Sequence, residues 1–247
     1  MKIIATYNIK GGVGKTSAAV NLAFIAARQN YKTLVWDLDP QGASSYYFRV
    51  KPKVKGGSKE LIAGNRELDG LIKATDFENL DLLPADFSFR NLDLVLDARK
   101  KPTQRLKKLL KPLTKEYDFI ILDCPPNISL LSEAIFEASE ILISPIVPTT
   151  LSLRTLEQLK KYIKDNQLKH LQLIPFFSMA DRRKKMHREI METLTEKHPD
   201  ILQSIIPYAS DIERMGWERM PLGGYVNKGR SLEAFQSLWQ EIMNLIE

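Results

Sequence analysis

Cysteine is the residue type that this sequence uses least, because Cys124 is the only one among 247 residues. One cysteine cannot form a disulfide within a chain, so a disulfide-stapled secreted domain is excluded. The sequence also lacks an apolar run long enough to cross a bilayer. An apolar, strand-like segment begins almost at the first residue, which leaves no room for a signal peptide. We therefore expect a cytoplasmic protein.

A strong charge bias is missing as well. Lys and Arg number 36 and Asp and Glu number 30, a formal net charge of +6, which permits a nucleic acid or acidic partner without requiring one. The basic residues are unevenly distributed, since residues 99–115 contain eight Lys or Arg and no Asp or Glu. That run is also typical of a solvated helix face. A second cluster precedes and opens a predicted helix of residues 183–197, where cations are unfavourable unless an anion is near. We expect these residues to contact DNA phosphates: Arg182, Arg183, Lys184, Lys185 and Arg188.

Strand-like and helix-like segments alternate along the chain, and no repeat or low-complexity segment interrupts them. Such alternation is typical of a parallel sheet covered by helices. We expect an α/β fold with a doubly wound, mostly parallel sheet flanked by helices on both faces, in a single domain of residues 1–247. Helices are expected at 87–96 and 106–113, and a last helix should place Leu245 and Ile246 with its core-facing residues. The expected strands are residues 3–5, 32–37, 80–84, 118–123, 141–146, 171–176 and 201–206.

The most informative segment follows the first strand. A strand, a glycine-rich loop ending in Gly-Lys-Thr and a helix, in this order, predict a phosphate-binding loop. Glycines let backbone N–H groups approach phosphate oxygens, and the helix N-terminus adds free donors. Lys15 is expected to reach the β- and γ-phosphates, and Thr16 to offer its hydroxyl to Mg²⁺. The segment, KGGVGKTS, consists of Lys10, Gly11, Gly12, Val13, Gly14, Lys15, Thr16 and Ser17.

Aspartates end two of the predicted strands. Asp37 and Asp39 belong to the segment DLDPQG, and Asp123 ends the strand of residues 118–123. The carboxyl ends of parallel strands form the ligand edge of such a sheet. Asp123 is therefore expected to hold the Mg²⁺ hydration shell opposite Thr16. Taken alone, DLDPQG is also typical of an acidic turn that caps the next helix.

The phosphate-binding loop departs from the generic motif in a way that carries a resemblance. The generic motif has glycine five residues before Gly14, where this chain has Ile9, and Lys10 is an additional lysine. KGGVGKTS resembles the deviant Walker A box of the ParA/MinD family of partitioning and positioning ATPases. DLDPQG resembles the switch I segment of that family, and DCPP at residues 123–126 resembles its switch II. No helix-turn-helix segment precedes the loop, so the resemblance is to the short ParA type, Soj-like or carboxysome-positioning.

This resemblance implies an ATPase that uses ATP and Mg²⁺ and forms an ATP-dependent homodimer. In the family a signature lysine, here Lys10, reaches the partner's nucleotide, and the second switch I aspartate, here Asp39, positions the attacking water. Lys10, Lys15 and Asp39 are then catalytic, and Thr16, Asp39 and Asp123 serve the metal. The segment after the last strand lies against the adenine, which implies Pro207 and Ala209. The family also implies non-specific binding to nucleoid DNA, hence a nucleoid-associated protein, and a ParB-like or other cargo adaptor that stimulates hydrolysis.

Four other functions have to be weighed against this one. A MinD-like membrane-cycling ATPase needs basic residues beside a C-terminal amphipathic helix, but no Lys or Arg follows Arg230, so we expect no membrane partner. An iron–sulfur reductase of the same superfamily needs two cysteines per chain and is excluded. A metabolic ligase with a related loop stays open, because the sequence identifies no substrate site. A non-catalytic scaffold is disfavoured, because the expected phosphate, metal and water ligands are all present.

Overall fold

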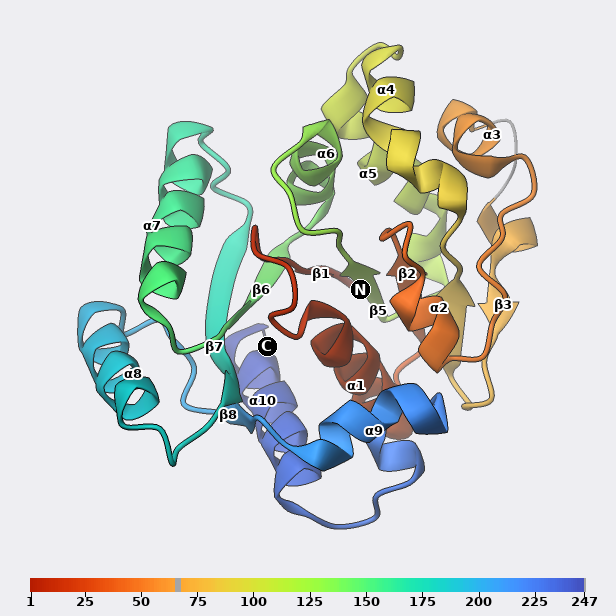
Figure 1. Ribbon diagram of the computed structural model, residues 1–247. Helices are drawn as coiled ribbons and strands as arrows, with labels where there is room; N and C mark the ends of the chain where they lie inside the picture. The colour runs from red at the N-terminus through yellow and green to blue at the C-terminus, as the bar shows by residue number, and fades with distance from the viewer. Residues whose placement is uncertain (65–67, 247) are drawn as a thin grey trace.

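Over residues 1–64 and 68–246, which the computed structural model describes, the chain forms an eight-stranded sheet (Figure 1). The strand order is β3-β4-β2-β5-β1-β6-β7-β8, and neighbouring strands are parallel except for the antiparallel pair β3 and β4. The structure thus confirms the doubly wound, mostly parallel sheet. The strands are β1 Lys2–Thr6, β2 Thr33–Asp37, β3 Lys73–Ala74, β4 Leu80–Leu83, β5 Phe119–Asp123, β6 Ile141–Ile146, β7 Gln172–Ala180 and β8 Ile205–Pro207.

Helices cover both faces of the sheet. In Figure 1, α3, α4, α5 and α6 lie on one side of it and α1, α9 and α10 on the other. The helices are α1 Lys15–Arg28, α2 Ala43–Tyr47, α3 Gly57–Ala63, α4 Leu92–Asp97, α5 Arg105–Leu110, α6 Leu130–Ala138, α7 Thr150–Asp165, α8 Lys185–Lys197, α9 Ser210–Glu218 and α10 Arg230–Ile246. Short 3₁₀ helices occupy Leu68–Leu71, Phe87–Asn91, Pro102–Gln104, Pro112–Lys115 and Leu222–Gly224.

The central strands are apolar throughout because each of their faces is covered. Successive side chains of a strand point to opposite faces of a sheet. In β1, Ile3 and Ala5 join the core cluster that contains α4, α5 and α6, while Ile4 joins the cluster that contains α1 and α10. All five residues of β5 are buried. A two-sided core of this kind explains why the strands read as continuous apolar runs.

The C-terminal helix closes the second core cluster. Trp239 is fully buried, its ring packs edge-on against Phe119, and its Nε1 donates to Gln29 Oε1 at 2.9 Å. The prediction that Leu245 shares this core face is wrong, because its side chain is 49% exposed. Among the described residues, no helix is long and apolar enough to span a membrane. The apolar side of α10 packs against the second core cluster.

The predicted boundaries needed correction at four elements. The strand expected at 171–176 is β7, which continues to Ala180. The strand expected at 201–206 is only β8; just before it, Gln203 N and Ser204 Oγ donate to the Glu241 carboxylate, while Leu202 N donates to Pro175 O of β7 at 2.9 Å. The helix expected at 87–96 is a 3₁₀ turn followed by α4. The helix expected at 106–113 stops at the end of α5, because Pro112 has no N–H to continue the α-helical ladder. None of these differences alters the sheet.

Candidate functional site

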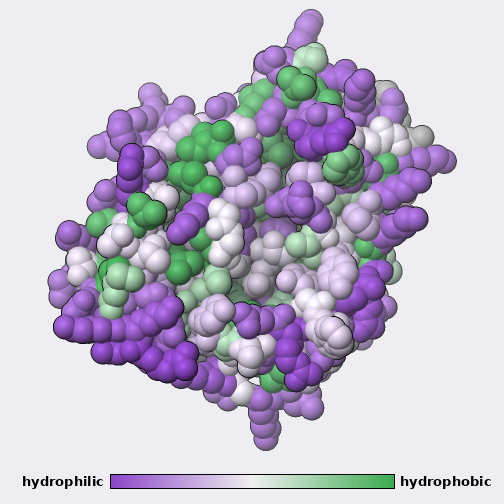
Figure 2. Space-filling model, in the orientation of Figure 1, coloured by the Kyte–Doolittle hydropathy of each residue, from purple (hydrophilic) through white to green (hydrophobic). Residues whose placement is uncertain are grey.

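The loop between β1 and α1 has the backbone conformation of a phosphate cradle. Gly12 and Gly14 have φ angles of 67° and 93°, in the left-handed region that side chains rarely occupy. A Cβ added at Gly14 would lie 2.6 Å from Ser178 Oγ, so β7 also limits this position to glycine. Lys15 begins α1 and is only 7% exposed. Figure 2 shows a pale hollow in the middle of the face where Figure 1 places this loop.

The ammonium group of Lys15 lies inside this loop. Its Nζ donates to the Lys10 carbonyl at 3.3 Å, which is the one acceptor that the described residues give it. Burial lowers the pKa of Lys15, and the carboxylates of Asp123 and Asp39 counter that effect. An ammonium has three N–H donors, so Lys15 can donate to phosphate oxygens as well.

Two buried aspartates lie side by side at the carboxyl edge of the sheet. Asp37 and Asp123 are register partners on β2 and β5, and both are fully buried. Asp123 Oδ1 accepts from Thr16 Oγ1 at 3.2 Å, and its Oδ2 accepts from Ser44 Oγ at 2.7 Å. The expected juxtaposition of Thr16 and Asp123 is therefore present. Ser44, the second residue of α2, is a third member of this hydrogen-bonded group, and the sequence analysis did not identify it.

Asp37 is the other residue that sequence reasoning left without a role. Its Oδ2 accepts from both the backbone N–H and the hydroxyl of Ser45 at 2.7 Å, while its buried Oδ1 has no hydrogen-bond partner. Burial raises the pKa of Asp37, and the neighbouring Asp123 raises it further. Burial also raises the pKa of Asp123, although the hydrogen bonds from Ser44 and Thr16 oppose this. The sequence did offer one signal that Asp37 belongs to the site, because Asp37 lies at the end of a buried strand.

The described donor set fits ATP with Mg²⁺. A buried, partly uncompensated carboxylate pair beside a hydroxyl is an environment that a hard divalent cation completes with oxygen ligands. The left-handed glycines and the N-terminus of α1 supply backbone N–H donors for phosphates. A magnesium ion held here would neutralise charge on the β- and γ-phosphates. Cys124 is next to Asp123, but burial raises the pKa of its thiol, which keeps it protonated and unreactive.

Lys10 and Asp39 lie at the solvent side of this edge. Lys10 is exposed, and its backbone N–H donates to Asn8 Oδ1 at 2.9 Å, while Asn8 Nδ2 donates to Pro145 O at 2.9 Å. Asn8 therefore ties the start of the loop to β6. Asp39 is half-buried, and its Oδ1 accepts from the Gln41 N–H at 3.0 Å in a local turn. Its second carboxylate oxygen has no hydrogen-bond partner among the described residues and can accept from a water molecule.

The remaining expected residues lie further along the same sheet edge. Pro207 ends β8, which is two strands beyond β6 in the sheet, and Ala209 precedes α9. No hydrogen bond among the described residues joins either residue to the phosphate-binding loop. The second basic cluster follows β7 and opens α8. Arg183 donates to both oxygens of Asp181 and lowers the pKa of that carboxyl to about 2. Arg182 and Lys184 are exposed, and no ion pair among the described residues engages their side chains.

Glycine-to-alanine replacements provide a test of the loop geometry. Gly14→Ala is expected to destabilise the nucleotide-free protein by about 1–3 kcal/mol, because it combines a left-handed φ with the contact to Ser178. Gly11→Ala is the matched control, since its Cβ would meet Pro126 at an ordinary 3.7 Å, and we expect a change within about 0.5 kcal/mol. Urea unfolding measures both. Adding Ser178→Ala should recover part of the Gly14→Ala loss, and equal losses in the two single variants would contradict this geometry.

Comparison with known proteins agrees with the site. The AAA_31 model, described as an AAA domain, matches residues 1–174. The sporulation initiation inhibitor protein Soj of Bacillus subtilis is 31% identical over 98% of this chain and 98% of its own. The chromosome partitioning protein ParA of Myxococcus xanthus is 28% identical over 98% of this chain and 88% of its own.

A solved structure extends the comparison to bound ligands. Cobyrinic acid a,c-diamide synthase from Mycobacterium smegmatis, with a bound ATP analogue and magnesium, has a TM-score of 0.83 at 24% identity, covering 98% of this chain and 94% of its own. At that identity the likeness shows the fold alone. The family model covers more than half of the chain, and the relatives match it almost end to end. This chain is an ATPase that belongs to the ParA/MinD family.

Proposed function

We propose that residues 1–247 form one ATPase domain that dimerises with ATP, binds DNA without reading its sequence, and partitions or positions a cargo. The observation that carries this proposal is the contrast between two lysines of one loop. Lys15 is 7% exposed and directed into the loop, whereas Lys10 is exposed beside it. A buried lysine can serve the nucleotide of its own chain, and an exposed one can reach the nucleotide of a second chain.

The residue roles in this proposal follow from the contacts at the sheet edge. ATP phosphates lie on residues 11–17, with Lys15 at the β- and γ-phosphates. Thr16 and Asp123 hold the Mg²⁺ shell together with Ser44, and Thr16 Oγ1 lies 3.2 Å from Asp123 Oδ1. Asp39 orients the water that attacks the γ-phosphate, as a carboxylate in line with the leaving group can. Pro207 and Ala209 contact the adenine.

Exposed apolar residues support a dimer that forms on this edge. Ile128 follows β5 and is 49% exposed, and Leu151 lies in the first turn of α7, after β6, and is 60% exposed. Both therefore follow strands that end at the edge where Lys10 lies. Large apolar side chains of this kind are favourable when a second chain covers them. With nucleotide phosphates between the two lysine-bearing loops, ATP would stabilise the dimer, and ADP would do so less well.

The second basic cluster is the part of the molecule that we propose for DNA. Figure 2 shows a dense hydrophilic surface at the lower left, where Figure 1 places α8. Within the cluster Arg183 pairs with Asp181, Lys185 with Glu189, and Arg188 donates to backbone carbonyls. Arg182 and Lys184 remain available for phosphates. Dimerisation would place two such clusters on one particle, and two weak phosphate contacts then act together.

Binding to random-sequence duplex DNA tests this function. We expect binding with ATP and little with ADP or without nucleotide, and an affinity that falls steeply with salt because counterions are released. Arg182→Glu with Lys184→Glu should lower the affinity by roughly tenfold or more and reduce the salt dependence. The matched control is Lys164→Glu with Lys169→Glu, which reverses two exposed charges elsewhere. ATP turnover of both variants should stay unchanged.

The nucleotide dependence discriminates between this function and its alternatives. DNA binding that is equal in every nucleotide state would contradict a dimer controlled by ATP. No DNA binding in any state, with turnover only when a small carboxylic acid is added, would favour the ligase alternative. In the proposed cycle a ParB-like or other adaptor stimulates hydrolysis, the dimer leaves DNA, and the protein exchanges between nucleoid and cytoplasm.

A further inference from the structure

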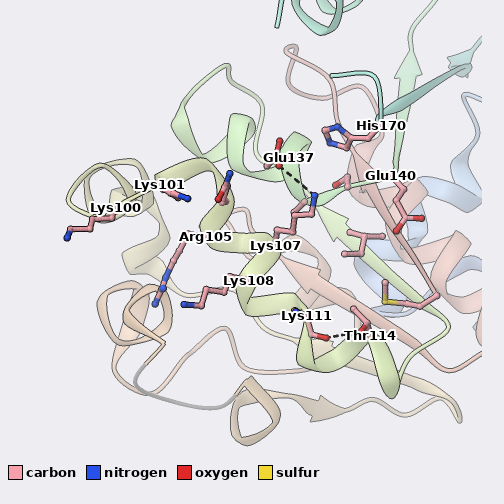
Figure 3. A pocket seen from close by; sticks show the side chains of 15 residues that line it. Lys100, Lys101, Arg105, Lys107, Lys108, Lys111, Thr114, Glu137, Glu140 and His170 are labelled. Carbon is pink, nitrogen blue, oxygen red and sulfur yellow. Dashed lines mark hydrogen bonds and ion pairs between the residues drawn. The ribbon is translucent and has the colours of Figure 1, made fainter. Parts of the chain in front are cut away.

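A second cavity lies at the opposite edge of the sheet from the ATP loop. Its volume is about 860 Å³, and it is enclosed by the segment 100–114, the end of α6, the starts of β1 and β6, and His170 (Figure 3). Met1 and Ile3 line it, whereas the phosphate-binding loop leaves β1 at its other end. A ligand in this cavity and a nucleotide on the loop therefore do not compete for space.

The acidic side chains of this cavity are already neutralised. Glu137 forms an ion pair with Lys107 at 3.6 Å, and Glu140 forms one with Lys2 at 3.5 Å. The guanidinium of Arg105 is also engaged, since it donates to the carbonyls of Ile62 and Ala63 and so caps the end of α3. These groups contribute little net charge to a ligand.

Four lysines of the cavity are not neutralised by an ion pair with any described residue. Lys100, Lys101, Lys108 and Lys111 line it, are exposed, and have no ion pair among the described residues. Figure 3 shows Lys100, Lys101 and Lys108 toward one end of the cavity and Glu140 and His170 toward the other. The positive charge is therefore distributed along one side of the cavity and does not converge on a point.

This distribution favours carboxylates on a chain over a phosphate group. Compact phosphate sites use a converging arginine fork or backbone N–H groups, and here the arginine is committed to carbonyls. No Phe, Tyr or Trp ring lines the cavity within the described part of the chain, so a nucleobase would have only the His170 imidazole to stack on. A DNA duplex is too broad to enter a cavity of this volume. The Met1 side chain, which is 41% exposed, and the lysine methylenes offer an apolar surface instead.

We propose that this cavity docks an acidic segment of a partner protein, in which carboxylates that pair with Lys100, Lys101, Lys108 and Lys111 flank an apolar side chain that covers Met1 and the lysine methylenes. The docking site is separate from the nucleotide, from the proposed dimer face and from the cluster of residues 182–188. Carboxylate contacts with these exposed lysines mainly accelerate association and select the partner, and the apolar contact limits dissociation.

A labelled peptide in which glutamates flank one leucine is the probe, with fluorescence anisotropy as the readout on the full chain. We expect saturable binding that weakens with salt and is lost when the glutamates are replaced by glutamines. Lys108→Glu with Lys111→Glu should weaken binding by roughly tenfold or more. Arg99→Glu with Lys115→Glu is the matched control, because both residues belong to the same basic run but do not line the cavity. This control should stay within about twofold.

The outcomes decide between a docking cavity and a merely basic surface. Equal weakening in the two charge-reversed variants, or no binding of the glutamate peptide to the native chain, would overturn the proposal. Displacement of the peptide by duplex DNA would also overturn it, since the lysines would then face nucleic acid. Lys108→Gln with Lys111→Gln introduces no new charge and should reproduce the loss in a smaller degree, so the test does not depend on the reversed variant folding. ATP turnover should stay within about twofold in every variant, because the loop lies at the other end of β1.

Discussion

Lys15→Ala is expected to abolish ATP hydrolysis and ATP-dependent self-association together. The Lys15 ammonium is buried, lies within 3.3 Å of the Lys10 carbonyl, and is the positive charge that the loop directs at the phosphates. Removing a preorganised charge of this kind costs roughly 10²–10³-fold in rate, and here the nucleotide itself is held less tightly. Phosphate release measures the first effect, and light scattering with size-exclusion chromatography measures the second.

Two further replacements make this result specific to Lys15. Lys10→Ala should retain ATP binding to the monomer but lose self-association, because the exposed Lys10 is proposed to act on the partner's nucleotide. Lys164→Ala removes an exposed lysine on α7 and should change neither measurement. Normal ATP-dependent self-association of Lys15→Ala would remove this residue from the nucleotide site.

Asp39→Ala is expected to separate ATP binding from hydrolysis. Its carboxylate lies in the loop after β2 and is held by the Gln41 N–H at 3.0 Å, so it can orient water without being needed for phosphate contacts. We expect hydrolysis to fall by roughly 10²–10⁴-fold, as for the loss of a group that positions and activates the nucleophile. ATP-dependent self-association and DNA binding should persist and become longer-lived, since the step that ends them is blocked.

The control for Asp39 is Asp97→Ala, which removes an exposed aspartate at the end of α4. It should leave turnover and DNA release unchanged. Turnover is measured by phosphate release and the DNA-bound lifetime by biolayer interferometry. If Asp39→Ala hydrolysed ATP at the native rate, Asp39 would have no part in the reaction, and another group would have to position the water.

Most of the sheet could be predicted because its strands are buried on both faces. The runs around Ile4, Val35, Ile121 and Ile143 are apolar for that reason, and their limits were right to within a residue or two. Prediction failed where residues at a boundary contact a segment from elsewhere in the chain. Gln203 and Ser204, which were predicted as strand residues, donate hydrogen bonds to Glu241 of α10, a contact that no local pattern contains.

The sequence by itself determined the phosphate-binding loop, since Gly12, Gly14, Lys15 and Thr16 are contiguous and their spacing is set by covalent geometry. It also determined that Asp123 ends a strand at the ligand edge. The tertiary structure alone decided that Ser44 and Thr16 share the Asp123 carboxylate and that Asp37 lies beside it, because β2 and β5 are neighbours only in the folded sheet.

The same distinction holds for the basic residues. The sequence showed two clusters of positive charge, and local composition is sufficient for that. Only the fold decided that Lys107 is paired with Glu137, that Arg105 is turned to carbonyls, and that the lysines of α5 line a cavity with the end of α6. Ion pairs and cavities depend on distances between segments, and these distances exist only after the chain has folded.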